Sequence, residues 1–395
     1  MAGARRPSGH REQTDLIRGG LTRSSFDETA EAMYLTSGYV YSSASEAEAA
    51  FARQQDRYVY SRYGNPTVTM FEERLRLLEG AEACMATASG MAAVFASLAS
   101  VVSAGDRIVA GRALFGSCSV ILTEILPRWG VETVLVDGGD LDQWQAALAR
   151  PTRIVFLETP SNPGLEIVDL RAVSELAHAA GAMVVVDNVF ASPVLQKPLE
   201  LGADVVVYSA TKHIDGQGRV LGGAILGTDQ YKTDHLMPFT RHTGPSLSPF
   251  NAWALVKGLE TLRLRVEAAS SSALTIAERL EHHDGVRRTG YPHLPSHPQH
   301  DLAKRQMTAG GTIVTVDLGS KAEAFRFLDD LALFDISNNV GDSKSLATHP
   351  ATTTHRRIGP EGRAAVGIGD GMVRLSIGLE DVEDLWSDLE RSLAN

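Results

Sequence analysis

Short, uninterrupted apolar runs alternate with segments of helical periodicity from about residue 67 to residue 227. A run that is apolar at every position needs cover on both faces, which a parallel sheet between two layers of helices provides. The alternation therefore predicts an α/β fold with a mainly parallel sheet of the seven-stranded type. The runs that we expect as strands are 108–110, 131–136, 154–157, 183–186, 205–207 and 224–226, and the expected helices are 67–79, one that starts near 90, 118–129, 141–148 and 170–180.

The pattern changes on both sides of this region. Residues 1–60 are polar and lack a long period, which is typical of an arm that is disordered or wraps a partner subunit. After residue 250 the sequence predicts a long helix from Asn251 and then a smaller α+β domain. We therefore expect three parts: an arm of residues 1–60, a large domain of residues 61–250 and a C-terminal domain of residues 251–395. In the last of these, strands are expected at 313–316 and 373–377 and helices at 321–331 and 381–393.

The formal net charge of −11 disfavours nucleic acid and anionic membranes as general partners. Two cysteines, Cys84 and Cys118, make no disulfide framework and suit a reducing, cytoplasmic compartment. The first 20 residues have no apolar core, so we expect no signal peptide. The uncharged stretch 84–105 is dominated by Ser, Thr, Gly and Ala, so it does not predict a transmembrane span.

Polar side chains follow three of the expected strands. In an open α/β sheet, ligands bind beyond the carboxyl ends of the strands, so these side chains are expected to converge on one crevice. Lys212 follows Ser209 and Thr211 after one strand, and Asp187 follows another directly. Glu158 begins a polar segment after a third strand.

Lys212 has two interpretations. A lone lysine is usually a surface residue, but a desolvated lysine can lose its proton and attack a carbonyl. The hydroxyls of Ser209 and Thr211 could bind a phosphate beside it. Asp187 could simply end a strand or cap a helix, or its carboxylate could keep a pyridine nitrogen protonated.

The segment Ala88–Ala92 reads Ala-Ser-Gly-Met-Ala and precedes a helical stretch. A glycine there lets backbone N–H groups approach a phosphate at a helix N-terminus, although a tightly packed helix start would have the same sequence. Two other patterns are weaker. The glycines of 216–222 have the wrong spacing for a dinucleotide site, and the histidines of the C-terminal loops lack a recognised ligand spacing, so no metal is expected.

Five ordered motifs together resemble the Cys/Met-metabolism family of enzymes that depend on pyridoxal 5'-phosphate (PLP), of fold type I. The resemblance spans about residues 20–393. It implies that residues 61–250 form the PLP-binding domain and that the active unit is a homotetramer, a dimer of dimers with shared active sites. The motifs are Tyr60–Thr67, Ala88–Met91, Glu158–Pro163, Asp187–Asn188 and Ser209–Lys212.

The resemblance also implies a role for each matching residue. Lys212 would be the Schiff-base lysine and the main proton shuttle, and Asp187 would pair with the pyridine nitrogen. Arg374 would clamp the substrate α-carboxylate, a task that suits the guanidinium fork. The other implied contacts are Gly90, Met91, Ser209 and Thr211 on the phosphate, Tyr60 and Arg62 on that phosphate from the neighbouring subunit, and Asn162 on the ring hydroxyl.

The sequence departs from the family pattern at two positions. The tyrosine that usually stacks on the cofactor ring is matched by Phe115, which keeps the stacking and loses the phenol. The second departure lies in the segment 339–346, whose Asn339 and Lys344 are further candidates for substrate contacts. Lys344 stands where family members that handle cysteine or cystathionine tend to have an acid. A lysine there would repel the amino group of cysteine and attract hydrosulfide or a succinyl carboxylate.

The resemblance therefore implies a γ-replacement in methionine biosynthesis. O-succinyl-L-homoserine and hydrogen sulfide would give L-homocysteine and succinate. Three relatives of this reaction stay open: use of cysteine as the nucleophile to make cystathionine, use of O-acetyl-homoserine, and a γ-lyase reaction on methionine or cystathionine. A non-catalytic scaffold would be favoured by loss of Lys212 or Asp187, and both are present.

Overall fold

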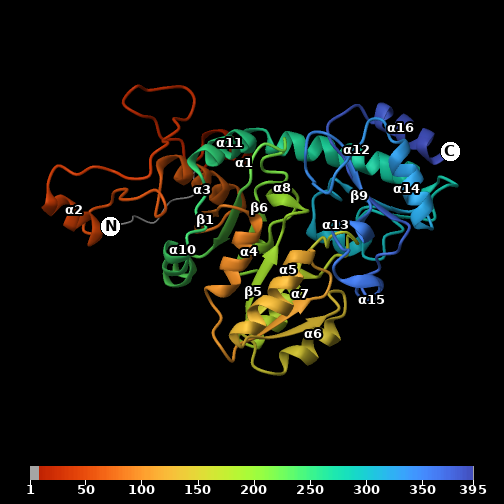
Figure 1. The fold of residues 1–395 in the computed structure, drawn as a ribbon, viewed down its shortest axis with the longest axis horizontal. Coiled ribbons are helices and arrows are strands. Elements are labelled where there is room, and N and C mark those ends of the chain that lie inside the picture. The colour runs from red at the N-terminus through yellow and green to blue at the C-terminus, as the bar shows by residue number, and fades with distance from the viewer. Residues whose placement is uncertain (1–8, 395) are drawn as a thin grey trace.

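The computed structural model describes residues 9–394 and contains two β-sheets that lie side by side (Figure 1). The larger sheet has seven strands in the order β1-β7-β6-β5-β4-β2-β3. All neighbours pair in parallel except β7, which is antiparallel to both β1 and β6. This confirms the predicted fold class. The strands are β1 (Ala83–Thr87), β2 (Arg107–Gly111), β3 (Glu132–Val136), β4 (Ile154–Glu158), β5 (Met183–Asp187), β6 (Val205–Ser209) and β7 (Gly223–Gly227).

Alternate residues of each central strand enter two different cores. In β4, Val155 and Leu157 pack on one face, whereas Ile154 and Phe156 pack on the other. Both faces need cover, which explains why these strands are apolar throughout. One face is covered mainly by α3 (Pro66–Glu79), α6 (Leu141–Leu148), α7 (Leu170–Ala179) and α8 (Ser192–Leu195), and the other by α4 (Gly90–Ala99) and α5 (Gly116–Val120), with α9 (Asp229–Tyr231) and α10 (Met237–Thr243) beside them.

The smaller sheet has five strands in the order β10-β11-β12-β9-β8 and encloses a core of its own. Two consecutive helices, α11 (Pro249–Glu260) and α12 (Leu262–Glu281), run from the large sheet to the small one (Figure 1). The sequence predicted one long helix here, and the structure breaks it at Thr261. The remaining elements are β8 (Arg288–Gly290), α13 (His300–Gln306), β9 (Ile313–Asp317), α14 (Lys321–Asp330), β10 (Asp335–Ile336), β11 (Leu346–Thr348), α15 (Gly359–Ala364), β12 (Met372–Ser376) and α16 (Val382–Ala394).

Helix α1 (Glu12–Arg18) packs against α3 on the body of the molecule, and the chain after it runs out as an extended arm that carries α2 (Ala44–Phe51) (Figure 1). The expectation that residues 1–60 lack regular structure was wrong at these two helices. The arm exposes large apolar side chains, among them Phe26 at 88% and Val40 at 91%. The first eight residues, which belong to the predicted arm and to the segment judged not to be a signal peptide, lie outside the described part.

Two elements of the large domain also differ from the sequence-based prediction. Strand β1 was not predicted, because its sequence Ala-Cys-Met-Ala-Thr carries no β-branched apolar residue. The expected helix over 118–129 is divided into α5, a π-helical turn at Ile121–Ile125 and a 3₁₀ turn at Leu126–Trp129. Within residues 9–394, no helix combines the length and the apolar character that a membrane span requires.

Candidate active site

A cavity of about 250 Å³ opens beyond the carboxyl ends of β4, β5 and β6, where ligands bind in open α/β sheets. Polar residues at or just after the end of each of these strands line the cavity. The C-terminal domain closes the cavity from the opposite side through β12 and the loop before β11. The structure brings together here the predicted residues Gly90, Met91, Phe115, Asn162, Asp187, Ser209, Thr211, Lys212 and Arg374.

Lys212 follows β6 and points its amine toward the C-terminal domain. Its Nζ donates a hydrogen bond of 2.6 Å to Oδ1 of Asn339, which is the contact that the structure gives to the predicted substrate residue Asn339. Burial and the nearby Arg374 cation lower the pKa of Lys212 to about 8. A lysine with such a pKa is neutral in roughly a tenth of the molecules at pH 7, and the neutral amine is the nucleophilic form.

A pair of buried carboxyl groups lies at the ends of β4 and β5, where Glu158 stands opposite Asp187 in the sheet register. Burial raises the pKa of both groups, to about 7 for Asp187, and their mutual repulsion adds to the rise for Glu158. The oxygens of Glu158 accept hydrogen bonds from the backbone N–H groups of Phe115 (2.7 Å) and Asn162 (3.0 Å). Asp187 accepts one bond of 3.1 Å, from the N–H of Val189.

Glu158 is a site residue that the sequence analysis quoted in a motif without giving it a role. By binding the backbones of Phe115 and Asn162, it fixes two walls of the cavity at once. A usable signal was present, because an acid directly after a fully apolar strand is unusual unless its carboxylate has buried partners.

The N-terminus of α4 faces the cavity opposite the end of β6. Ser89 caps this helix by accepting a 3.1 Å hydrogen bond from the N–H of Ala92. The next residue, Gly90, lies so close to β6 that a Cβ atom there would meet Cβ of Ser209 at 2.5 Å. The first N–H groups of a helix have no partner inside the helix, so this terminus offers donors and a partial positive charge to an anion.

Arg374 lies in β12 and is only 2% exposed. Its guanidinium donates 2.9 Å hydrogen bonds to Oδ1 of Asn162 and to the carbonyl of Asn338. Its Nε is buried and has no partner, and no acid within residues 9–394 forms an ion pair with it. Burial lowers its pKa to about 10. A buried guanidinium without a counter-ion can bind a carboxylate from a ligand.

The cavity fits a cofactor of the pyridoxal phosphate type on its own geometry. The start of α4 and Ser209 provide donors for a phosphate, and Asp187 provides a carboxylate for a ring nitrogen. Phe115 lines the cavity with an aromatic ring, and Lys212 supplies an amine. A cation beside Asp187 would offset the repulsion between the two buried carboxylates.

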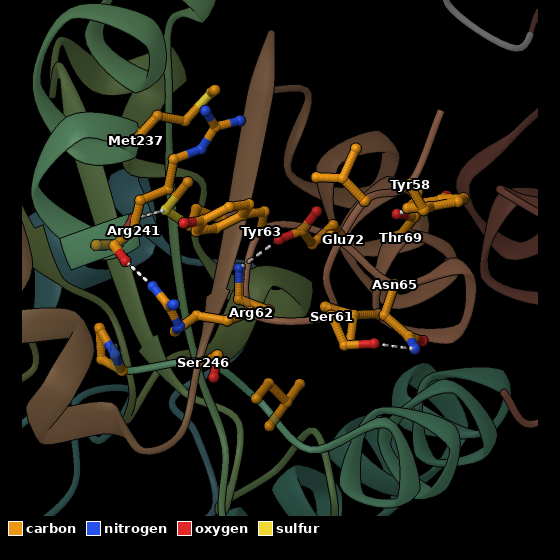
Figure 2. Close-up of a pocket in the computed structure, with 18 of the residues that line it drawn as sticks. Tyr58, Ser61, Arg62, Tyr63, Asn65, Thr69, Glu72, Met237, Arg241 and Ser246 are labelled. Atoms are coloured by element: carbon orange, nitrogen blue, oxygen red, sulfur yellow. Dashed lines mark hydrogen bonds between the residues drawn. The ribbon is translucent and has the colours of Figure 1, made fainter. Parts of the chain in front are cut away.

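Three predicted residues lie elsewhere. Tyr60, the last residue of the arm, and Arg62, just after it, are exposed, and Arg62 lines a second, larger cavity of about 870 Å³ between the end of the arm and α10 (Figure 2). Lys344 points into solvent with 64% of its side chain exposed, and its Nζ lies 3.6 Å from Asp342. The structure therefore does not bring Lys344 into the cavity of Lys212. Among residues 9–394, no group of three or more His, Cys, Asp and Glu side chains is placed to hold a metal ion.

Comparisons with known proteins agree with this geometry. A family model described as "Cys/Met metabolism PLP-dependent enzyme" matches residues 13–394. The chain is 64% identical to O-succinylhomoserine sulfhydrylase of Mycobacterium tuberculosis strain H37Rv, over 98% of this chain and 97% of that one. It is 48% identical to the O-succinylhomoserine sulfhydrylase of Pseudomonas aeruginosa, over 96% and 94%. The solved cystathionine gamma synthase of Xanthomonas oryzae, in complex with aminoacrylate and cysteine, superimposes with a TM-score of 0.93 at 36% identity and covers 98% of both chains.

Proposed function

The chain belongs to the Cys/Met-metabolism family of PLP-dependent enzymes, and from that premise we propose that it makes L-homocysteine from O-succinyl-L-homoserine and hydrogen sulfide. The observation that carries the chemistry is a buried amine, Lys212, that shares one cavity with a buried guanidinium, Arg374, whose Nε has no hydrogen-bond partner. The identities of 64% and 48% to proteins named for this reaction support the choice of substrates. The reaction replaces a C–O bond at Cγ by a C–S bond and releases succinate.

When bound, PLP supplies an electron sink that stabilises negative charge on the carbon beside the substrate amino group. Asp187 would accept a hydrogen bond from the protonated ring nitrogen, and that positive charge would compensate the buried carboxylate. The N-terminus of α4, together with Ser209 and Thr211, would hold the phosphate. Asn162 would contact the ring hydroxyl, and Phe115 would stack on the ring without offering a phenol proton.

Lys212 moves the protons of the reaction. Its neutral amine accepts the α-proton of the substrate, and as an ammonium it returns a proton when the product forms. Asn339 accepts a hydrogen bond from the same amine and so orients it. Arg374 binds the α-carboxylate through its free Nε side, which holds the reacting carbon near Lys212.

The use of cysteine to make cystathionine is the second candidate, because a solved relative is a cystathionine gamma synthase. The lining of the Lys212 cavity argues against it. Glu158 and Asp187 are the acids among the described lining residues, and both already serve the cavity walls and the ring nitrogen. No further carboxylate of that lining is available to receive the ammonium group of an incoming cysteine.

We also propose that two copies share each active site, in a homotetramer in the cytoplasm. The arm extends from its own chain and exposes apolar side chains that a second copy would cover. Tyr60 and Arg62 lie at the end of this arm, away from the Lys212 cavity of their own chain, so they would serve the phosphate of the neighbouring copy. Gel filtration with light scattering measures the number of copies directly.

The test of the reaction is a product profile. The purified protein is given PLP and O-succinyl-L-homoserine, with sulfide in one tube and cysteine in another, and the products are separated by chromatography. We expect homocysteine with sulfide to form faster than cystathionine with cysteine. Faster cystathionine formation would keep the cofactor chemistry and replace the proposed nucleophile.

A further inference from the structure

The second cavity contains two arginines that share one tyrosine. It lies between the arm, the start of α3 and α10, and it has a volume of about 870 Å³ (Figure 2). The guanidinium carbons of Arg62 and Arg241 lie 4.9 and 5.1 Å from the ring centre of Tyr63. The guanidinium of Arg62 also donates to the backbone carbonyl of Arg241, which ties the arm to α10. The two cations are therefore held as one unit.

Neither of these arginines has an acidic partner within residues 9–394. The lining includes two acids, Asp56 and Glu72. Glu72 is engaged with Lys232 and with the N–H of Ala86, and neither acid forms an ion pair with Arg62 or Arg241 within residues 9–394. Arg241 is half-buried, and burial lowers its pKa, to which the positive charge of Arg53 adds. Unpaired guanidinium groups in a partly desolvated cavity attract carboxylate or phosphate anions.

The proposed substrate has one more anionic group than the Lys212 cavity can bind. Arg374 accounts for the α-carboxylate, and the succinyl group carries a second carboxylate four carbons from the ester oxygen. Lys212 and Arg374 are the cations of the described lining, so none remains for this second carboxylate. Lys344, which the sequence analysis considered for it, points into solvent beside Asp342.

We propose that Arg241 of one copy binds the remote carboxylate of the succinyl group in the active site of a second copy, and thereby selects O-succinyl-L-homoserine over O-acetyl-L-homoserine. The proposal rests on the proposed function and on the shared assembly. Arg62 is assigned to the phosphate in the neighbour's Lys212 cavity. Because Arg62 donates a hydrogen bond to the backbone carbonyl of Arg241, Arg241 would lie at the opening of that same cavity. One guanidinium then serves the cofactor and the other serves the substrate.

The first experiment compares two substrates in matched variants. Arg241→Met and Arg53→Met remove one positive charge each from the same neighbourhood, but Arg53 does not line the cavity. The holoenzyme is assayed with sulfide and either O-succinyl- or O-acetyl-L-homoserine. For Arg241→Met we expect kcat/KM with the succinyl substrate to fall about 10- to 100-fold and kcat/KM with the acetyl substrate to change less than about twofold. Arg53→Met should keep the ratio of the wild type.

Other outcomes would overturn the proposal. An equal loss on both substrates in Arg241→Met would assign Arg241 to the cofactor or to folding, and an unchanged ratio would remove it from the site. If the ratio of kcat/KM for the succinyl substrate to kcat/KM for the acetyl substrate falls in Lys344→Met and not in Arg241→Met, Lys344 would be the cation that selects the succinyl group. A wild-type protein that uses neither acyl-homoserine would instead refute the proposed function, so the two failures are distinguishable.

The second experiment tests whether Arg241 acts across copies. Lys212→Ala chains and Arg241→Met chains are mixed, dissociated and reassembled. A mixed pair then contains one site with Lys212 from the Arg241→Met chain and Arg241 from the Lys212→Ala chain. We expect such mixtures to regain activity on the succinyl substrate beyond the sum of the two parents. Reassembled mixtures that stay at that sum would show that both residues must come from one chain, and the proposal would fail.

Discussion

The two cavities of this molecule differ in how far one chain completes them. Around Lys212, the charged groups are buried and meet partners from several elements of the same chain, such as Asn339 for Lys212 and two backbone N–H groups for Glu158. Around Tyr63, the aromatic rings remain exposed, at 40% for Tyr60 and 37% for Tyr63, and the guanidiniums of Arg62 and Arg241 form no ion pair with an acid of residues 9–394. One chain therefore supplies the amine and the buried acids of the first cavity, whereas we propose that the arginines of the second cavity serve the Lys212 cavity of a neighbouring copy.

The largest effect should follow from removing the amine of the first cavity. We expect Lys212→Ala to lower homocysteine formation by at least about 10³-fold, because both the nucleophile and the proton carrier are lost. The variant and the wild type are compared by the initial rate of thiol formation. Lys304→Ala, at an exposed lysine of α13, is the matched control and should keep the wild-type rate. Full turnover by Lys212→Ala would show that the reaction does not take place in the first cavity, and the contrast between the two cavities would no longer hold.

The next effect in size concerns the buried guanidinium. We expect Arg374→Lys to lower kcat/KM about 100-fold, mainly through KM, because an ammonium cannot reproduce the fork that binds a carboxylate. The loss should be equal for O-succinyl- and O-acetyl-L-homoserine, which share the α-carboxylate. Steady-state kinetics with both substrates separates this behaviour from that of Arg241. A loss confined to the succinyl substrate would mean that Arg374, and not Arg241, binds the carboxylate of the succinyl group.

The fold was largely predictable because the sequence of each central strand shows by itself that the strand is buried on both faces. Runs such as Val184–Val186 and Val205–Val207 are apolar at every position, which only a two-sided core requires. Strand β1 was not predictable in this way, because its residues are mostly small and have low strand propensity. It forms a strand at the edge of the sheet because it pairs with β7, which is distant in sequence. The break between α11 and α12 at Thr261 has no proline beside it, and the nearest glycine, Gly258, lies inside the last turn of α11, where it does not by itself predict a break.

The residues of the site were predictable where they directly follow a predicted strand. They were less predictable where they lie far from those strands in the sequence. Lys212, Asp187 and Asn162 were placed at one crevice by the strands before them. Arg374 and Phe115 required the family resemblance, because sequence separation hides their approach. The role expected for Lys344 depended on a side-chain direction that no local pattern encodes, and the structure points this side chain into solvent.

The arm offers the next test of the comparison. We expect Arg62→Met to weaken PLP binding about tenfold, because a charge-assisted contact to the phosphate is lost from the neighbouring copy. The affinity is measured by titrating the cofactor-free protein with PLP and recording absorbance. Arg53→Met, at an arm residue of the same charge that does not line the cavity, serves as the control. An unchanged affinity would mean that the second cavity serves no neighbour's phosphate.

A buried network beneath the first cavity should affect turnover least. The hydroxyl of Tyr208 donates to Oε2 of Glu79 (2.6 Å) and accepts from Nδ2 of Asn188 (2.7 Å), directly after Asp187 in the chain. Burial raises the pKa of Glu79 from 4.5 to about 8. The folded chain thus keeps a proton that the unfolded chain releases above pH 4.5. Stability should therefore fall as the pH rises from about 4.5 to 8 and level off above it.

Glu79→Gln keeps the size of this side chain and an acceptor for Tyr208, and it removes the titration. We expect the variant to gain stability relative to the wild type as the pH rises from 5 to 8, by on the order of 1–3 kcal/mol, with turnover at pH 7 nearly unchanged. Urea unfolding of both proteins at a series of pH values measures the difference. Glu361→Gln, at an exposed acid of α15, should show no such trend. A difference that stays constant from pH 5 to pH 8 would mean that Glu79 is already ionised in the folded chain, and the network beneath the first cavity would then be charged.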